Sequence, residues 1–339
     1  MFNFERKALV FADGDLIFYY TGFFVEDGYL IILGDKKYLL TDGRYIEHAK
    51  IKTDADCRLL AEYPLVEFLK SKNVETVGIY FNYSSANLYK TLISSGFNVY
   101  DCESEYQNLS KIKSESELAK IKKACEITET ALVKTLPYIK EGVSELDVSC
   151  ELEYNFKKLG GKVGFDTIVA FGKNSSVPHY QTSNVKLQPN SPVLIDFGAC
   201  YGGYLADMTR TLFFGEPNKK FLSVYEAVKT AHLKAVNELR AGMLACEVDL
   251  ISRSFLKQSG LDKYFLHSLG HGVGVKIHEF PTLSKKSSVK IENGMVFTVE
   301  PGVYLENEFG VRIEDTVTVR NGKCVSLMTL DKEPIIINR

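Results

Sequence analysis

Four carboxylates and one imidazole stand where the local sequence should turn them toward a common centre: Asp196, Asp207, His271, Glu300 and Glu314. Two of the acids belong to one predicted hairpin and two to another, and glycines flank the histidine on both sides. Hard and borderline divalent ions prefer oxygen and imidazole donors, and bridging carboxylates let two ions share one site. The set therefore predicts a metal-dependent hydrolase.

The first pair of acids lies in a predicted β-hairpin. Asp196 is in the apolar run 192–197, which is typical of a buried strand, and Asp207 is on the run that returns after a turn centred on Tyr201 and Gly202. This turn puts the two aspartates opposite each other, with Cβ atoms about 4.5–5.5 Å apart. Like charges so placed repel, and a cation between them reverses the sign of that interaction.

A second predicted hairpin repeats this arrangement. The apolar run 295–299 ends in Glu300, the return strand 310–319 carries Glu314, and a loop centred on Asn307 joins the two strands. Glu300 and Glu314 should therefore face each other. Any one of these acids alone could be a solvated strand residue, but two facing pairs with His271 between them in the sequence favour a metal site.

Composition limits the class of protein. The chain has 339 residues, 45% hydrophobic and 25% charged, which suits a globular protein of two domains. A net charge of -2 without a long basic run argues against a nucleic-acid partner. We find no apolar stretch long enough for a membrane span and no signal peptide at the N-terminus. The seven scattered cysteines form no Cys-x-x-Cys pair, which predicts reduced thiols in a cytoplasmic protein and no cysteine ligand.

The first hundred residues alternate apolar strands with amphipathic helices. We expect strands at 8–11, 29–33, 37–40 and 77–81 and helices at 63–72 and 84–95, which predicts an α/β domain with at least one parallel crossover. The polar stretch 101–113 is the candidate linker. After it, Ser114 and Glu117 form a predicted capping box that begins a long helix reaching about residue 138.

The rest of the chain contains a faint internal repeat. Residues 139–148 resemble residues 239–248, at an offset of 100 positions. Each copy follows a long helix and leads through a second helix into the strands of one acid-bearing hairpin. Two α-α-β-β halves related by a pseudo-two-fold axis would bring both hairpins to a shared centre.

Several short motifs carry a family resemblance. Besides the five metal-capable residues and their neighbours, they include residues 203–211, 267–274, 278–281, 299–302 and 311–315. These motifs resemble those of the pita-bread metallopeptidases, in the branch of Xaa-Pro aminopeptidases (aminopeptidase P) and Xaa-Pro dipeptidases (prolidases). Residues 20–23 and 40–45 resemble the creatinase-type N-terminal domain.

The resemblance implies an α+β fold with two domains. Residues 1–112 would form a creatinase-like α/β domain, and residues 113–339 would form the pita-bread catalytic domain with pseudo-two-fold halves. Such N-terminal domains usually begin with a helix, whereas here an apolar strand comes almost at once, so we expect the first helix to be absent from this chain. The family commonly forms dimers, which implies a homodimer.

The resemblance also implies a reaction. In the family, the counterparts of Asp196, Asp207, His271, Glu300 and Glu314 bind two divalent ions, commonly manganese with cobalt or zinc as alternatives, and the second aspartate and last glutamate bridge them. A metal-bridging hydroxide would cleave the bond between an N-terminal residue and proline, with Glu300 transferring the proton. The substrates would be peptides with proline at the second position.

Three more histidines and an arginine complete the expected site. His179 and His278 resemble family residues that contact the substrate and the intermediate, and His267 resembles a histidine near the proline pocket. Arg312 precedes Glu314 by two positions and so shares its strand face. We expect it to pair with a bridging carboxylate, with binding of a substrate carboxylate as the less favoured role.

Other functions remain as alternatives. A metal-free creatinase-like enzyme or peptide-binding homologue would lack ligands that are present here, and a methionine aminopeptidase would usually lack a domain like residues 1–112. The choice between aminopeptidase and dipeptidase is closer. Dipeptidases often carry an arginine in the loop after the His278 counterpart, whereas residues 282–291 hold three lysines and no arginine. This loop favours the aminopeptidase.

Overall fold

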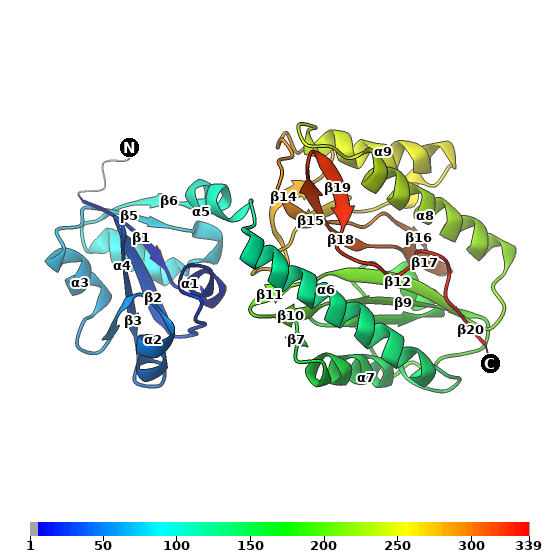
Figure 1. Cartoon of the computed structure of the whole chain (residues 1–339), viewed down its shortest axis with the longest axis horizontal. Coiled ribbons are helices and arrows are strands. Elements are labelled where there is room, and N and C mark those ends of the chain that lie inside the picture. Colours follow the sequence, from blue (N-terminus) through cyan, green and yellow to red (C-terminus); the bar gives the residue numbers. More distant parts are fainter. Residues whose placement is uncertain (1–5, 339) are drawn as a thin grey trace. The chain divides into compact units, whose positions relative to one another are not determined.

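The computed structural model describes residues 6–338. The chain divides into two compact units, Met1–Ser110 and Lys111–Arg339. Figure 1 shows both units, coloured along the chain. Within the described residues, no helix combines the length and the apolar composition that a membrane crossing requires.

The first unit is built on a six-stranded sheet in the order β4-β3-β2-β1-β5-β6. The pairs β1–β2 and β2–β3 are antiparallel, whereas β3–β4, β1–β5 and β5–β6 are parallel. The expected parallel crossover is therefore confirmed. The strands are β1 Lys7–Phe11, β2 Gly28–Leu33, β3 Lys36–Thr41, β4 Asp56–Leu59, β5 Thr76–Ile79 and β6 Asn98–Asp101. The helices are α1 Gly14–Thr21, α2 Ile46–Lys52, α3 Leu65–Ser71, α4 Ala86–Ser94 and α5 Glu103–Ser110, with a 3₁₀ turn η1 at Phe81–Tyr83.

Two expectations for this unit need comment. The polar stretch 101–113, which we expected to be a linker, is largely the helix α5, because its acidic first turn suits a helix N-terminus. A helix before β1 would fall in residues 1–5, which lie outside the described residues, and β1 itself begins at Lys7.

The second unit contains two similar halves. In the first half, α6 (Glu115–Thr135) begins at the expected Ser114 capping box and continues through η2 (Leu136–Tyr138). Then follow α7 Glu145–Lys158, β7 Lys162–Val163, β8 Ile168–Phe171, η3 Gly172–Ser176, β9 Ser191–Phe197, β10 Ala199–Tyr201, β11 Tyr204–Leu205 and β12 Met208–Phe214. Strands β8, β9 and β12 share a four-stranded sheet with the C-terminal β20 (Ile336–Ile337).

The second half has the same helix–helix–strand order. Its helices are α8 Lys219–Glu238 and α9 Ala245–Gln258, followed by η4 Asp262–Tyr264. Its strands are β13 Gly270–Gly272, β14 Glu279–Leu283, β15 Val296–Val299, β16 Gly302–Leu305, β17 Phe309–Arg312, β18 Asp315–Arg320 and β19 Lys323–Ser326. Figure 1 shows the helices as two pairs, α6 with α7 and α8 with α9.

Backbone hydrogen bonds confirm the internal repeat. The Gly142 amide donates to the Leu187 carbonyl at 3.1 Å, and the Gly242 amide donates to the Ile291 carbonyl at 2.8 Å. Both glycines have positive φ, 83° and 96°, which glycine adopts without steric cost. The two connections between paired helices therefore bond in the same way to the segments that precede β9 and β15.

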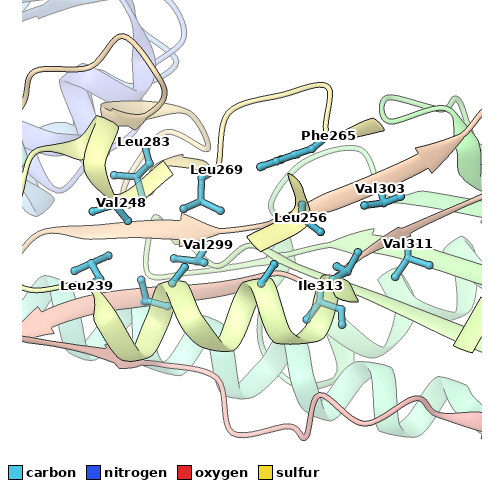
Figure 2. Close-up of a cluster of buried hydrophobic side chains, with 14 of the residues drawn as sticks. Leu239, Val248, Leu256, Phe265, Leu269, Leu283, Val299, Val303, Val311 and Ile313 are labelled. Carbon is cyan, nitrogen blue, oxygen red and sulfur yellow. The ribbon is translucent and has the colours of Figure 1, made fainter. Parts of the chain in front are cut away.

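The hydrophobic core of the second half shows which face of its strands is buried and which face is left for other side chains. Figure 2 shows part of it, where Val248 and Leu256 of α9 pack with Val299, Val303, Val311 and Ile313 of the strands. Every buried residue of this cluster between 295 and 319 has an odd number: 295, 297, 299, 303, 305, 309, 311, 313, 317 and 319. Because side chains alternate along a strand, the even-numbered residues, Glu300 and Glu314 among them, face away from this core.

Candidate metal centre

The second hairpin has the expected register. In β16–β17, Gly302 pairs with Arg312, and in β15–β18, Val299 pairs with Asp315. Glu300 and Glu314 lie between these two ladders, so they face each other as predicted. The turn is centred on Asn307, whose φ of 59° lies in the left-handed region that asparagine tolerates.

The first hairpin differs from our expectation by two residues. Thr209, rather than Asp207, pairs with Asp196. The turn residues are Gly202 and Gly203, with φ of 56° and 81°, instead of Tyr201 and Gly202. A two-residue hairpin turn with positive φ at both central positions favours two glycines, and this preference sets the register.

The acids and the imidazole nevertheless meet. Ligand atoms of Asp207, His271 and Glu314 all lie within 4.8 Å of one another. His271 Nε2 is 3.5 Å from Asp207 Oδ2 and 3.4 Å from Glu300 Oε1. The charge of Asp196 raises the pKa of Glu314, second only to burial, so it lies close to the same group. All five sequence-predicted ligands therefore gather at one place.

Two buried oxygens of this group have no protein partner. Asp196 Oδ1 and Asp207 Oδ1 are both buried and accept no hydrogen bond from any described residue. Leaving a buried charged oxygen unsatisfied costs free energy, and a cation would offset that cost. The donor set and these two oxygens fit divalent ions.

The electrostatics of the carboxylates point the same way. Burial, followed by the charge of Glu314, raises the pKa of Asp207 well above its usual range. Burial and Glu314 do the same to the pKa of Glu300, and burial raises the pKa of Glu314 to about 8. These acids cannot all ionise near neutral pH without a compensating positive charge.

Burial keeps two of the site histidines, His267 and His271, neutral near pH 7. Burial lowers the pKa of His271 to about 3, and that of His267 to about 3. The Gly272 carbonyl, 3.1 Å from His271 Nδ1, can only accept a hydrogen bond, so the proton sits on Nδ1 and the Nε2 lone pair is free for an ion. His278 lies beside it, with ring centroids 4.2 Å apart. Both His278 and His179 are exposed.

Arg312 contacts groups of the site itself. Its Nη2 donates to Asp196 Oδ2 at 2.6 Å, its Nε to Thr209 Oγ1 at 2.9 Å, and its Nη1 to the Tyr304 hydroxyl at 2.7 Å. Thr209 in turn donates to Glu314 Oε2 at 2.6 Å. The guanidinium thus joins the two hairpins through their acids.

Tyr304 is a site residue that we did not predict. Its hydroxyl accepts from Arg312 and lies 2.8 Å from His267 Nε2, while His267 Nδ1 donates to the Ser268 carbonyl at 2.8 Å. The signal was present in the sequence, because Tyr304 occupies the same even-numbered face as Glu300 and Arg312.

Sequence models of two domain families match this chain. Residues 119–321 match metallopeptidase family M24, and residues 5–111 match the creatinase/prolidase N-terminal domain. The chain belongs to metallopeptidase family M24. Its two-part architecture is accordingly that of a creatinase-type N-terminal domain followed by a pita-bread domain, as expected.

The similarity to relatives and to solved structures extends over nearly the whole chain. An Xaa-Pro dipeptidase from Pyrococcus furiosus is 36% identical over 94% of this chain and 92% of its own length. The crystal structure of an X-Pro aminopeptidase from Thermotoga maritima is 32% identical, with a TM-score of 0.92 over 98% of this chain and 96% of that one. A prolidase from Pyrococcus horikoshii gives a TM-score of 0.92 at 33% identity, over 97% and 96%.

Proposed function

We propose that this protein is an Xaa-Pro dipeptidase (prolidase) that uses two divalent metal ions. The observation that carries the proposal is the convergence of four carboxylates and a neutral imidazole around two unsatisfied aspartate oxygens. The names of the relatives from the two Pyrococcus species support the dipeptidase over the aminopeptidase that the loop 282–291 had favoured.

The proposed metal ligands are Asp196, Asp207, His271, Glu300 and Glu314. Four carboxylates and one imidazole suit manganese, with cobalt or zinc as alternatives. When bound, such ions polarise the scissile carbonyl and acidify a water molecule.

The surrounding side chains would move the proton and hold the substrate. Glu300, whose Oε1 accepts from Thr298 Oγ1 at 3.2 Å, would take the proton of the attacking water and pass it to the leaving proline nitrogen. The exposed His179 and His278 would hydrogen-bond to the substrate, and His267, held by Tyr304, would border the proline ring. Arg312 would hold Asp196 in place through the hydrogen bond from Nη2 to Oδ2.

Substrate length separates this proposal from its alternative. We would compare kcat/KM of the manganese-loaded enzyme for Ala-Pro, for Ala-Pro-Ala, and for Ala-Ala as a control without proline. A dipeptidase binds the carboxylate that directly follows proline, and the tripeptide lacks that charge there, so we expect a preference of about 100-fold or more for Ala-Pro. The reverse preference would establish the aminopeptidase, and cleavage of neither proline peptide would contradict both functions.

We further propose a homodimer that works in the cytoplasm. The family resemblance and the seven cysteines, which form no disulfide within the described residues, support this setting. Light scattering on the eluting protein would test the assembly, because a single chain has a mass of 38.1 kDa. A mass equal to one chain would contradict the dimer.

A further inference from the structure

His179 lies on a segment with little regular structure. Between β8 and β9, the chain forms only the short turn η3, and the histidine side chain itself is exposed. A segment without strand partners needs other contacts to keep one conformation, since each ordered residue costs roughly 1–2 kcal/mol of backbone entropy. Five such contacts come from one acidic side chain outside the metal centre.

Glu145, the first residue of α7, is fully buried and points into this segment. Its Oε1 accepts hydrogen bonds from the Phe171 amide and from Asn174 Nδ2, both at 2.8 Å. Its Oε2 accepts from the Tyr180 hydroxyl at 2.9 Å, and from the Ser183 amide and hydroxyl at 3.1 and 2.8 Å. All five donors belong to residues 171–183, and they lie on both sides of His179.

The same segment contacts the candidate metal centre at its other end. Arg312 Nη1 donates to the Pro178 carbonyl at 3.3 Å, and the Gly310 amide donates to Ser175 Oγ at 2.9 Å. Partial desolvation lowers the pKa of His278, and the neighbouring His179 imidazole lowers it further, so the two histidines are near each other. A change in residues 171–183 would therefore move His179 relative to the site.

We propose that Glu145 is a positioning residue for the reaction: its buried carboxylate holds residues 171–183 in the conformation that presents His179 to the substrate. This inference rests on the proposed function. Five hydrogen bonds to two oxygens of one side chain fix both ends of the segment at a single point, which suits Glu145 to this task. A displacement of about 1 Å at a substrate contact can cost about 100-fold in rate.

The other half of the unit uses the same device. Asp249, buried on α9, accepts from the Leu269 amide at 3.2 Å and pairs with Arg253. Arg253 donates to the carbonyls of Phe265 and His267, at 3.0 and 2.9 Å. In each half, a buried acid on the second helix thus fixes the segment that carries a site histidine.

A double-mutant cycle tests the inference. We would measure kcat/KM for Glu145→Gln, for His179→Ala and for the double variant on the proline peptide that the wild type cleaves. We expect Glu145→Gln to lower kcat/KM by about 10- to 100-fold in the wild type and by less than about twofold when His179 is already absent. Manganese content should not change. An equal loss in both backgrounds would overturn the inference.

Glu129 supplies a matched control. It is also a buried helical acid that accepts hydrogen bonds from a loop, through the Thr329 amide and hydroxyl at 2.6 and 2.9 Å, but that loop does not carry a site histidine. We expect Glu129→Gln to change kcat/KM by the same factor with and without His179. If Glu145→Gln fails to fold, Asn174→Ala removes a single donor and carries the same cycle.

Hydrogen exchange separates failure of this inference from failure of the proposed function. If the wild type cleaves neither proline peptide, the proposed function is wrong, and mass-spectrometric exchange on the metal-loaded protein still tests Glu145. We expect Glu145→Gln to speed exchange in peptides covering 168–185 and not in those covering 323–333, with the reverse for Glu129→Gln. Unchanged exchange at 168–185 would overturn the inference whatever the activity.

Discussion

Metal binding should release protons, and the number follows from the site. In the metal-free protein, the pKa of Glu314 is raised to about 8, and the pKa values of Asp207 and Glu300 lie well above their usual range. A group with a pKa of about 8 is roughly 90% protonated at pH 7. Because metal ligands must be ionised, loading the site has to expel these protons. We expect close to one proton from Glu314 per fully loaded chain at pH 7, and the raised pKa values of Asp207 and Glu300 add to this number.

Calorimetry measures this release directly. Metal-free protein is titrated with Mn²⁺ at pH 7 in buffers that differ in ionisation enthalpy, and the slope of observed heat against that enthalpy gives the proton number. The release should fall as pH rises toward 9, since Glu314 is by then mostly ionised, and the apparent affinity should rise with pH over the same range. A slope near zero at pH 7, or an affinity that falls as pH rises from 6 to 8, would refute the reasoning.

Three substitutions test separate parts of the site. Arg312→Lys loses the planar guanidinium that donates to Asp196, Thr209 and a tyrosine hydroxyl, and should lower kcat/KM by about 10- to 100-fold. The surface substitution Arg320→Lys is the control and should leave kcat/KM unchanged. Equal kinetics for the two variants would contradict the role given to Arg312. Tyr304→Phe removes the hydroxyl between Arg312 and His267 and should lower kcat by about 10-fold with little change in KM, and wild-type kinetics would contradict this. Gly198→Ala would bring a Cβ within 1.9 Å of the Ala206 carbonyl oxygen, and should lower the free energy of unfolding in denaturant by about 3 kcal/mol or more. Gly43→Ala is the control: its Cβ meets nothing within 4 Å, and the free energy of unfolding should fall by about 0.5 kcal/mol or less. A small loss for Gly198→Ala would show that the hairpin is not as closely packed as described.

The second hairpin was predictable from local pattern alone. Most odd-numbered residues between 295 and 319 are apolar, which assigns one face to the core, and the loop around Asn307 has the composition of a turn. These two signals determine both the register and the facing of Glu300 and Glu314. Local rules suffice here because both strands lie within one short hairpin.

The first hairpin shows why an error in register did not displace the acids. The turn at Gly202–Gly203 shifts the pairing by two residues from the one we expected. Since side chains alternate with a period of two, a shift of two keeps every residue on the same face, and Asp196 and Asp207 still reach the same group. A shift of one would have turned Asp207 away.

Other features depend on contacts that no local pattern reveals. Glu145 and Ser183 are 38 positions apart, and Arg312 and Asp196 are 116 apart. The spacing of residues within a hairpin does not predict which loop contacts the N-terminus of a distant helix. The role of Glu145 could therefore be inferred only from the fold. The helix α1 was missed for a different reason: its eight residues include a run of apolar and aromatic side chains that reads equally well as a strand.

The central claim is that five residues hold two divalent ions that peptide hydrolysis requires. Metal-free enzyme titrated with Mn²⁺, while hydrolysis of Ala-Pro and Ala-Pro-Ala is recorded, tests it most directly. We expect no activity before addition, and a rise on one of these peptides that reaches its plateau at two equivalents per chain. Full activity without added metal, or a plateau unrelated to the number of ions bound, would contradict the account.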